Sequence, residues 1–402
     1  MDILIKLIVI IGYCLFFVYL IHKEKRAALY SIIVFGNVGV LVSLILIEMG
    51  LYITEQRVFG FQNGAFFIYS LFSYMGLITF FTFSKITETG NFNFLSKPKK
   101  LFLPIYILFA LIIFLAFLKN PDFNRFNIFD GPFKMTLVRI ENIFFFLFLY
   151  SLFRKKHINE KIVIYVFYCI IMFARGSQFG AFLIAGLWFF MSLKIDEIKI
   201  RPKYYILLIV FSALPFAIKI YSNDISYSLM RMVLQGHVFW GTVNIFNESG
   251  ANPDFSGFIS NFNDLFSSFQ MGNINYGFGK LMKEVSPQFG EMYMEGGVRF
   301  SAGYPAILIY HFGYLSGLFL HLFFTITYFY LINFMIKCFK YKDVFFSYFY
   351  YLIFIVYSDL LIMGEYAHFR LKFLIKLGIL FLIHLLYKNY SNKKNTSFVA
   401  PN

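Results

Sequence analysis

Apolar runs recur along nearly the whole chain, and many are about as long as the 20 residues that an α-helix needs to cross a membrane. Short segments that contain charged residues separate these runs. Only 14% of the residues are charged and 59% are hydrophobic, whereas a water-soluble domain carries about a quarter charged residues. Backbone polar groups in hydrocarbon must be satisfied within each segment, so the runs predict helices. The sequence therefore predicts an all-α, polytopic membrane protein.

We expect about eleven transmembrane helices and one large loop. They divide the chain into an N-terminal transmembrane bundle of about eight helices at 1–222, a loop at 223–302, and a C-terminal bundle of about three helices with a short tail at 303–402. The predicted spans are 3–21, 28–53, 64–84, 101–118, 136–153, 162–174, 179–193, 204–222, 306–336, 344–363 and 371–387.

Clusters of Lys and Arg fall in alternate connections between the runs, for example at 23–26, 154–161 and 194–203. By the positive-inside rule these connections are cytoplasmic, which places the N-terminus and the 223–302 loop outside and the C-terminus inside. The formal net charge of +15 resides largely in such clusters. It is therefore read as a topology signal, and nucleic acid is not an expected partner.

The ninth run is too long for one simple crossing. It contains or closely follows Gly303, Pro305, Gly313 and Gly317. We therefore predict that its first part is broken or re-entrant. Such irregular backbone is tolerated at membrane depth where it lines a cavity or is buried in protein.

Several charged residues fall inside the predicted spans, each in the outer half of its span. With Arg175 and Arg370, they predict a net cationic cavity that opens outward. Lys6, Lys219 and Lys372 are expected instead to extend towards the headgroups. The charged residues in the spans are Lys6, Glu48, Arg139, Glu141, Lys219, Asp359, Lys372 and Lys376.

Metal and nucleotide chemistry have little support in the sequence. No Walker loop and no His-Glu-x-x-His motif occurs, and the seven histidines lack metal-ligand spacing. The predicted cytoplasmic connections are too short for a nucleotide-binding domain. We expect no cofactor and a metal-independent activity.

Arginine at an outward cavity suits a phosphate or diphosphate, because guanidinium stays charged and donates two parallel hydrogen bonds. The anionic ligands expected there are lipid headgroups and lipid-linked sugars. Sugar transfer from a polyprenyl pyrophosphate needs cations for the diphosphate and one base for the acceptor hydroxyl. The candidate bases are Glu291, Glu295, His237 and His311. Glu291 and Glu295 also have the plainer interpretation of solvated loop charges.

Arg231 falls within a predicted amphipathic helix at 227–237. It is equally interpreted as a headgroup anchor or as a ligand of the substrate. Arg299 closes a loop segment that also holds the two candidate carboxylates, immediately before the ninth run.

Two stretches resemble motifs of the O-antigen polymerase (Wzy) family, the oligosaccharide repeat-unit polymerases. The stretch 175–186 begins with Arg175 and ends with Gly186, and it is similar to an Arg-x10-Gly pattern. The stretch 301–317 is similar to the aromatic-x-Phe-Gly-x-x-x-Gly segment that follows the family's large outer loop. The resemblance implies a GT-C-like transmembrane fold and assigns diphosphate or sugar binding to Arg175. The other expected binding residues are Arg299, Arg231, Arg139, Arg370 and Tyr304.

The same resemblance implies transfer of a growing glycan from undecaprenyl pyrophosphate onto a lipid-linked repeat unit, at the periplasmic face of a bacterial inner membrane. The implied partners are the undecaprenyl-pyrophosphate-linked oligosaccharide, membrane lipids and a chain-length regulator protein. Three alternatives remain open: a lipid-linked oligosaccharide flippase, an O-antigen ligase, and a membrane O-acyltransferase. A flippase is expected to show two similar halves, and no internal repeat is visible in the sequence.

Overall fold

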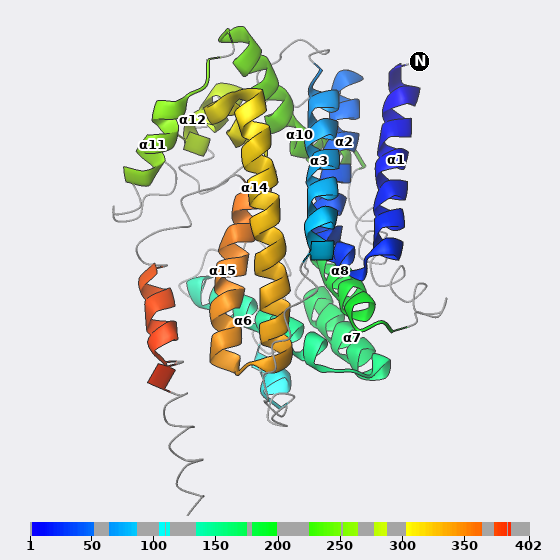
Figure 1. The fold of residues 1–402 in the computed structure, drawn as a ribbon, viewed down its shortest axis with the longest axis vertical. Helices are drawn as coiled ribbons and strands as arrows, with labels where there is room; N and C mark the ends of the chain where they lie inside the picture. The colour runs from blue at the N-terminus through cyan, green and yellow to red at the C-terminus, as the bar shows by residue number, and fades with distance from the viewer. Residues whose placement is uncertain are drawn as a thin grey trace, which may run out of the picture.

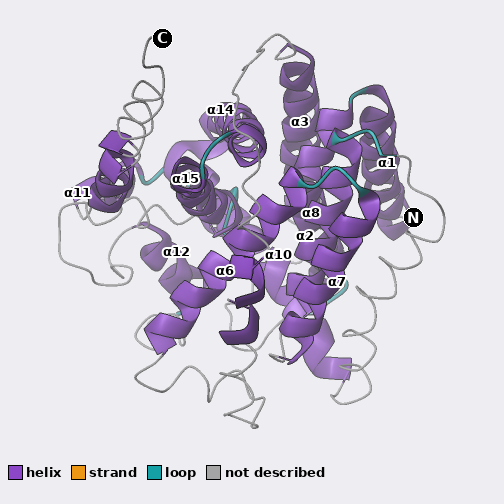
Figure 2. Ribbon diagram, turned by 90° about the horizontal axis from the view of Figure 1, so that it is seen from below, coloured by secondary structure: helices purple, strands orange, loops and turns teal. Residues whose placement is uncertain are grey.

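The computed structural model describes residues 2–51, 64–86, 104–108, 110–112, 134–174, 179–198, 225–250, 252–263, 277–287, 303–363, 374–383 and 385–386. Every regular element within these ranges is a helix, and the helices pack as a bundle (Figure 2). The prediction of an all-α fold is confirmed for this part of the chain.

Five helical segments are long and apolar enough to cross a membrane, so the chain has the character of a multi-pass membrane protein (Figure 1). On α1 the side chains of Leu4 and Leu15 are 63% and 65% exposed, as expected for a face that contacts lipid. The predicted count of about eleven spans is not shown, and one predicted span, 204–222, lies outside the described residues. The five segments are Asp2–Lys23, Lys25–Glu48, Ala65–Lys85, Ala306–Tyr341 and Val344–Leu361.

Most of the predicted spans that fall in the described ranges coincide with helices to within a few residues. The last one, 371–387, is helical over 374–383. The helices are α1 (Asp2–Lys23), η1 (Lys25–Tyr30, a 3₁₀ helix), α2 (Ser31–Glu48), α3 (Ala65–Ile86), α6 (Lys134–Arg154), α7 (Ile158–Ala174), α8 (Phe179–Ile195), α10 (Ile225–Glu248), α11 (Phe255–Asn263), α12 (Gly277–Val285), α14 (Ala306–Tyr341) and α15 (Val344–Met363).

Helix α14 is broken at Gly313, as the sequence predicts. Gly313 has φ 77° and ψ −178°, a conformation that interrupts the helix and that glycine adopts without a steric penalty. The segment 306–312 then lies back against the longer segment that follows. Leu308 packs so closely on Gly317 that a Cβ at Gly317 would stand 3.2 Å from the Leu308 carbonyl. We call these two segments, 303–312 and 314–341, which meet at Gly313, the α14 hairpin.

Helix α10 packs against the middle of α2 through small residues. The Ser43 hydroxyl donates to the carbonyl of Val233 at 2.7 Å and accepts from the N–H of Gly236 at 2.8 Å. Small side chains let two helix backbones approach closely in an apolar medium. The segment 225–248 is thus a helix in the bundle, and it contains the predicted helix at 227–237. The outward side of the 223–302 segment stays a prediction.

Replacing Gly317 with valine tests the α14 hairpin. The new side chain would meet the backbone of Leu308, which cannot move aside as a flexible side chain can. We expect a loss of about 1–3 kcal/mol, the usual cost of overpacking, seen as a lower thermal midpoint of the purified protein in detergent.

The matched control is Gly378→Val, because a Cβ at Gly378 would meet no atom within 4 Å among the described residues. That variant is expected to keep a midpoint close to that of the parent protein. Equal midpoints for the two variants would contradict the hairpin packing.

Candidate functional site

A cavity of about 240 Å³ lies between α2, α3, α8 and α14, with further contributions from η1, α10 and α15. Its wall is mostly apolar, and it includes the exposed side chains of Phe35 and Ile184, so the cavity reaches the surface between α2 and α8. The polar side chains that line it are Tyr30, Asn37, Tyr69, Ser73, Gln235, Tyr304, His321, Thr325 and Tyr328.

A buried tyrosine–histidine pair forms one polar part of this lining. The Tyr304 hydroxyl lies 2.8 Å from Nδ1 of His321, and Nε2 of His321 lies 3.0 Å from the carbonyl oxygen of Phe72. A carbonyl oxygen only accepts, so Nε2 carries the hydrogen. In the neutral ring Nδ1 is then the acceptor, and the Tyr304 hydroxyl donates to it.

The α14 hairpin brings these two side chains together. Tyr304 lies near the start of the first segment, and His321 lies on the second segment, eight positions after Gly313 or about 12 Å along the helix. Pro305, joined to Tyr304 by a cis peptide bond, also lines the cavity. The pair therefore lies well below the turn of the hairpin.

A second polar group lies on α2 and α3. Asn37 donates to the Tyr13 hydroxyl at 2.9 Å and accepts from the Tyr69 hydroxyl at 3.0 Å. Both the nitrogen and the oxygen of the Asn37 amide are therefore hydrogen-bonded. With Gln235 from α10, the cavity presents neutral hydrogen-bonding groups beside apolar walls, an arrangement suited to an amphiphile that carries hydroxyl groups.

His311, one of the predicted bases, is buried in the first segment of the hairpin, and its Nδ1 donates to the carbonyl oxygen of Asp254 at 2.8 Å. The N–H of Asp254 in turn donates to the carbonyl of Tyr310 at 3.0 Å. The Tyr310 hydroxyl donates to Glu284 of α12 at 3.0 Å. His311 thus fastens the hairpin to the segments around α11 and α12, and it does not line the cavity.

Asp254 is itself held by several hydrogen bonds at the start of α11. Partial burial alone would raise the pKa of its carboxyl. Hydrogen bonds from Lys280, from the N–H of Gly257 and from Ser256, together with the charge of Lys280, lower this pKa below its ordinary value. Its stabilising effect is therefore present at neutral pH and is lost as the pH falls through the lowered pKa.

His237, another predicted base, is buried in α10 with its ring 5.1 Å from that of Trp240. Neither ring nitrogen has a hydrogen-bond partner among the described residues. Like His311, it is absent from the cavity lining. Among the predicted site residues whose side chains are described, only Tyr304 lines the cavity.

The remaining predicted site residues cannot be placed by their side chains. Arg231 lies on α10 and Arg139 on α6, and only their helical backbone is described. The predicted residues that lie outside the described ranges are Arg175, Glu291, Glu295, Arg299 and Arg370.

The described lining of the cavity contains no Lys, Arg, Asp or Glu. Four described charged residues that the sequence placed in a cationic cavity do not line it: Glu48, Glu141, Asp359 and Lys376. A cationic character therefore stays a prediction for the side chains that the structure does not describe. The expectation that Lys6 extends towards the headgroups is wrong, because its ammonium is buried and pairs with Asp2 and Glu48. A charge that is removed from water is retained where an opposite charge meets it.

His321 is the residue that sequence reasoning missed. It lies within the ninth apolar run, where an ionisable residue marks a functional candidate. Its pairing with Tyr304 follows from the hairpin, which sequence spacing alone does not reveal.

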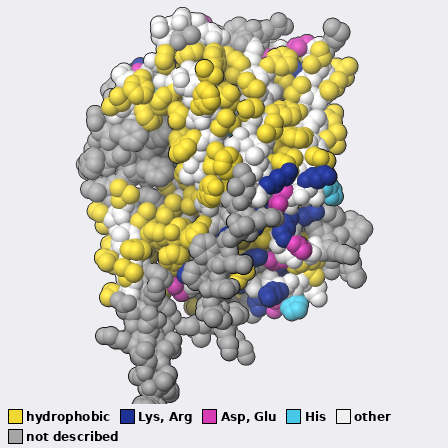
Figure 3. All heavy atoms as spheres, viewed as in Figure 1, with side chains coloured by type: hydrophobic (Ala, Val, Ile, Leu, Met, Phe, Trp, Pro, Cys, Tyr) yellow, Lys and Arg dark blue, Asp and Glu magenta, His cyan; other side chains and the backbone are white. Residues whose placement is uncertain are grey.

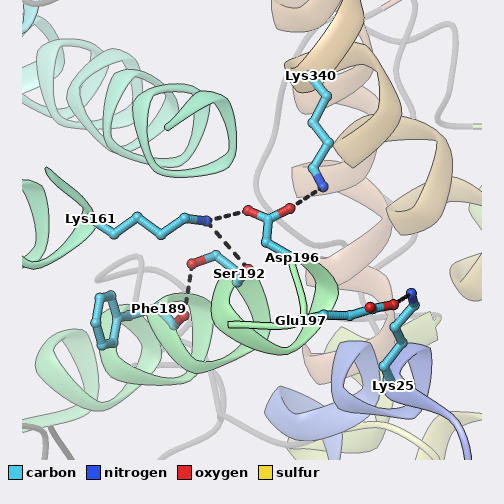
Figure 4. Close-up of polar contacts among 7 residues, drawn as sticks. All are labelled: Lys25, Lys161, Phe189, Ser192, Asp196, Glu197 and Lys340. Atoms are coloured by element: carbon cyan, nitrogen blue, oxygen red, sulfur yellow. Dashed lines mark hydrogen bonds and ion pairs between the residues drawn. The ribbon is translucent and has the colours of Figure 1, made fainter. Parts of the chain in front are cut away.

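Charged side chains gather at the other end of the bundle, around the ends of α1, α7 and α8, below a mostly hydrophobic surface (Figure 3). Asp196, just after α8, pairs with Lys161 of α7 at 2.6 Å and with Lys340 of α14 (Figure 4). The Lys161 side chain is 0% exposed, and it also donates to the carbonyl of Ser192 at 3.3 Å. This triad connects three helices at the end opposite the hairpin turn.

The comparisons with known proteins give one match. Residues 271–377 match a family of unknown function, DUF6418, and this range includes the whole of α12, α14 and α15. The comparisons with curated proteins and with solved structures found no match. The family match therefore coincides with the part of the chain that contains the α14 hairpin.

Replacing Asp196 with asparagine tests the triad. The substitution leaves the buried Lys161 ammonium without its opposing charge, and removing one partner of a buried pair costs about 3–5 kcal/mol. We expect a large fall in the thermal midpoint of the detergent-solubilised protein.

The neighbouring Glu197→Gln is the matched control. Glu197 pairs with Lys25, and both side chains are well exposed, so loss of this pair is expected to change the midpoint little (Figure 4). A small effect of Asp196→Asn, similar to that of the control, would contradict a structural role for the triad.

Proposed function

We propose that the chain is a membrane glycosyltransferase of the O-antigen polymerase class. It would transfer a growing glycan from undecaprenyl pyrophosphate onto a lipid-linked repeat unit. The reaction would take place at the outer face of the membrane, the periplasmic face of a bacterial inner membrane, without a metal ion.

One observation supports this proposal most directly. The two stretches that resemble the polymerase motifs lie far apart in sequence, yet both contribute to the same cavity. Leu183 and Ile184 come from the 175–186 stretch, and Tyr304 and Pro305 come from the 301–317 stretch. Chance matches to loose motifs have no reason to converge on one cavity, whereas two parts of one active site do.

The chemistry of the cavity suits a lipid-linked sugar. Its apolar wall reaches the surface between α2 and α8, where a polyprenyl chain in the bilayer would have access. Its hydroxyl, amide and imidazole groups suit the hydroxyls of a sugar. In sequence, Arg175 precedes α8 by four positions, and α8 supplies part of the wall. An arginine there would hold the diphosphate.

A polymerase and its rivals, a flippase or a ligase, predict different surface glycan when the gene is deleted. A polymerase is required only for glycan elongation, so its loss leaves single repeat units available for attachment. A flippase or a ligase is required for any glycan to reach the surface. The same gel therefore separates a polymerase from a flippase or a ligase.

Deleting the gene is expected to leave surface glycan with a single repeat unit in place of long chains. Arg175→Ala should reproduce this profile while the protein still accumulates in the membrane, because alanine cannot hold a diphosphate. The measurement is a gel profile of surface polysaccharide beside an immunoblot of the membrane fraction.

Lys156→Ala removes an exposed cation from another connection and is expected to restore long chains, as the parent gene does. Complete loss of surface glycan in the deletion strain would point to a flippase or ligase and overturn the proposal. Normal chain length with Arg175→Ala would remove Arg175 from the mechanism.

A further inference from the structure

The Tyr304–His321 pair has the geometry of a base that acts on a hydroxyl group. The Tyr304 hydroxyl donates to Nδ1 of His321 at 2.8 Å, and the Phe72 carbonyl, 3.0 Å from Nε2, fixes the ring. The ring nitrogen that faces Tyr304 is therefore the basic one in the neutral state. A nucleophile or relay with an adjacent base, which a third group orients, is a recurrent catalytic arrangement.

The position of the pair separates it from the other described histidines. Tyr304 and His321 both line the cavity and are 8% and 5% exposed. His311 already donates to the Asp254 carbonyl, and His237 is packed beside Trp240, and neither reaches the cavity. Among the described histidines, His321 is the one that lines this cavity.

The surroundings of His321 favour its neutral form. The other titratable groups that line the cavity in the described ranges are the hydroxyls of Tyr30, Tyr69, Tyr304 and Tyr328, from η1, α3 and the two arms of the hairpin. No carboxylate is among them to stabilise an imidazolium ion. A neutral imidazole is the form that can accept a proton.

We propose that Tyr304 and His321 together accept the proton of the acceptor sugar's hydroxyl group during glycan transfer. This inference rests on the proposed function and names the base that the reaction requires. It replaces the four bases expected from sequence, of which His237 and His311 are placed away from the cavity.

The acceptor oxygen forms a bond to the anomeric carbon of the donor sugar, and the bond from that carbon to the diphosphate oxygen breaks. The lipid diphosphate leaves with the electron pair of that bond. The acceptor proton passes to the Tyr304 oxygen as the Tyr304 proton passes to Nδ1 of His321. The imidazolium then returns its proton to solvent or to the departing diphosphate.

The test uses the full chain in proteoliposomes that contain lipid-linked repeat units extracted from the deletion strain. Initial rates of polymer formation are measured over a range of pH for the parent protein, Tyr304→Phe and His321→Gln. General base catalysis typically contributes about 100- to 10,000-fold. We expect each variant to lose turnover on this scale with little change in the substrate concentration for half-maximal rate.

Two further signatures separate proton transfer from mere positioning. The parent rate should fall at acid pH as His321 becomes protonated, and this fall should be absent in His321→Gln. The double variant should lose no more than either single variant, because the two groups act as one unit.

Tyr351→Phe is the matched control. Tyr351 is also buried, and its hydroxyl donates to the carbonyl of Asn142, away from the cavity. It is expected to retain the parent rate. Tyr304→Phe removes one oxygen and keeps the ring. If His321→Gln does not accumulate, the turnover of Tyr304→Phe still tests whether the pair accepts the proton.

Different results would overturn the proposed function and the assignment of the base. If the parent protein forms no polymer from lipid-linked repeat units, the proposed function is wrong. If the parent polymerises and both variants keep its turnover and pH profile, the function stands and the assignment of the base is overturned.

Discussion

The contact between the two segments of the α14 hairpin is the interaction on which the cavity depends. Gly313 permits the turn, and Gly317 lets the Leu308 backbone lie against the second segment. In a straight helix Tyr304 and His321 would be about 25 Å apart. In the hairpin a single hydrogen bond of 2.8 Å joins them. The Tyr310 hydroxyl donates to Glu284, and His311 donates to the carbonyl oxygen of Asp254. These two hydrogen bonds hold the first segment against the residues around α11 and α12.

The buried lysines among the described residues are paired with carboxylates, as an apolar environment requires. Lys6 is neutralised by Asp2 and Glu48, and Lys161 is neutralised by Asp196. The polar groups that face the cavity are different in kind, because its described lining is uncharged. The charged sets connect helices, while the neutral hydrogen-bonding groups face space that a ligand can enter. The structure therefore separates the groups that hold the bundle from the groups available for chemistry.

Sequence reasoning predicted the parts of the fold that follow from hydrophobic periodicity and from glycine and proline. The predicted span 344–363 coincides with α15, and the break before Gly317 is present at Gly313. Side-chain pairings were less accessible, because they depend on how distant segments pack. Lys6 was expected to reach the headgroups and instead meets Glu48 of another helix. The role proposed for His321 depends on the hairpin, which places Tyr304 beside it. The loop residues from Glu291 to Arg299 lie outside the described ranges, and their roles stay predictions.

The central claim is that the cavity between α2, α3, α8 and α14 holds the lipid-linked sugar. A photoreactive amino acid at Leu187, which lines the cavity, tests it most directly when the variant is irradiated in cells that make the repeat unit. A matched variant at Val163, which is 66% exposed on α7 and away from the cavity, reports on general contact with lipid. The account predicts a glycan-bearing adduct at Leu187 and none at Val163. Equal capture at both positions, or none at Leu187 in an active variant, would contradict it.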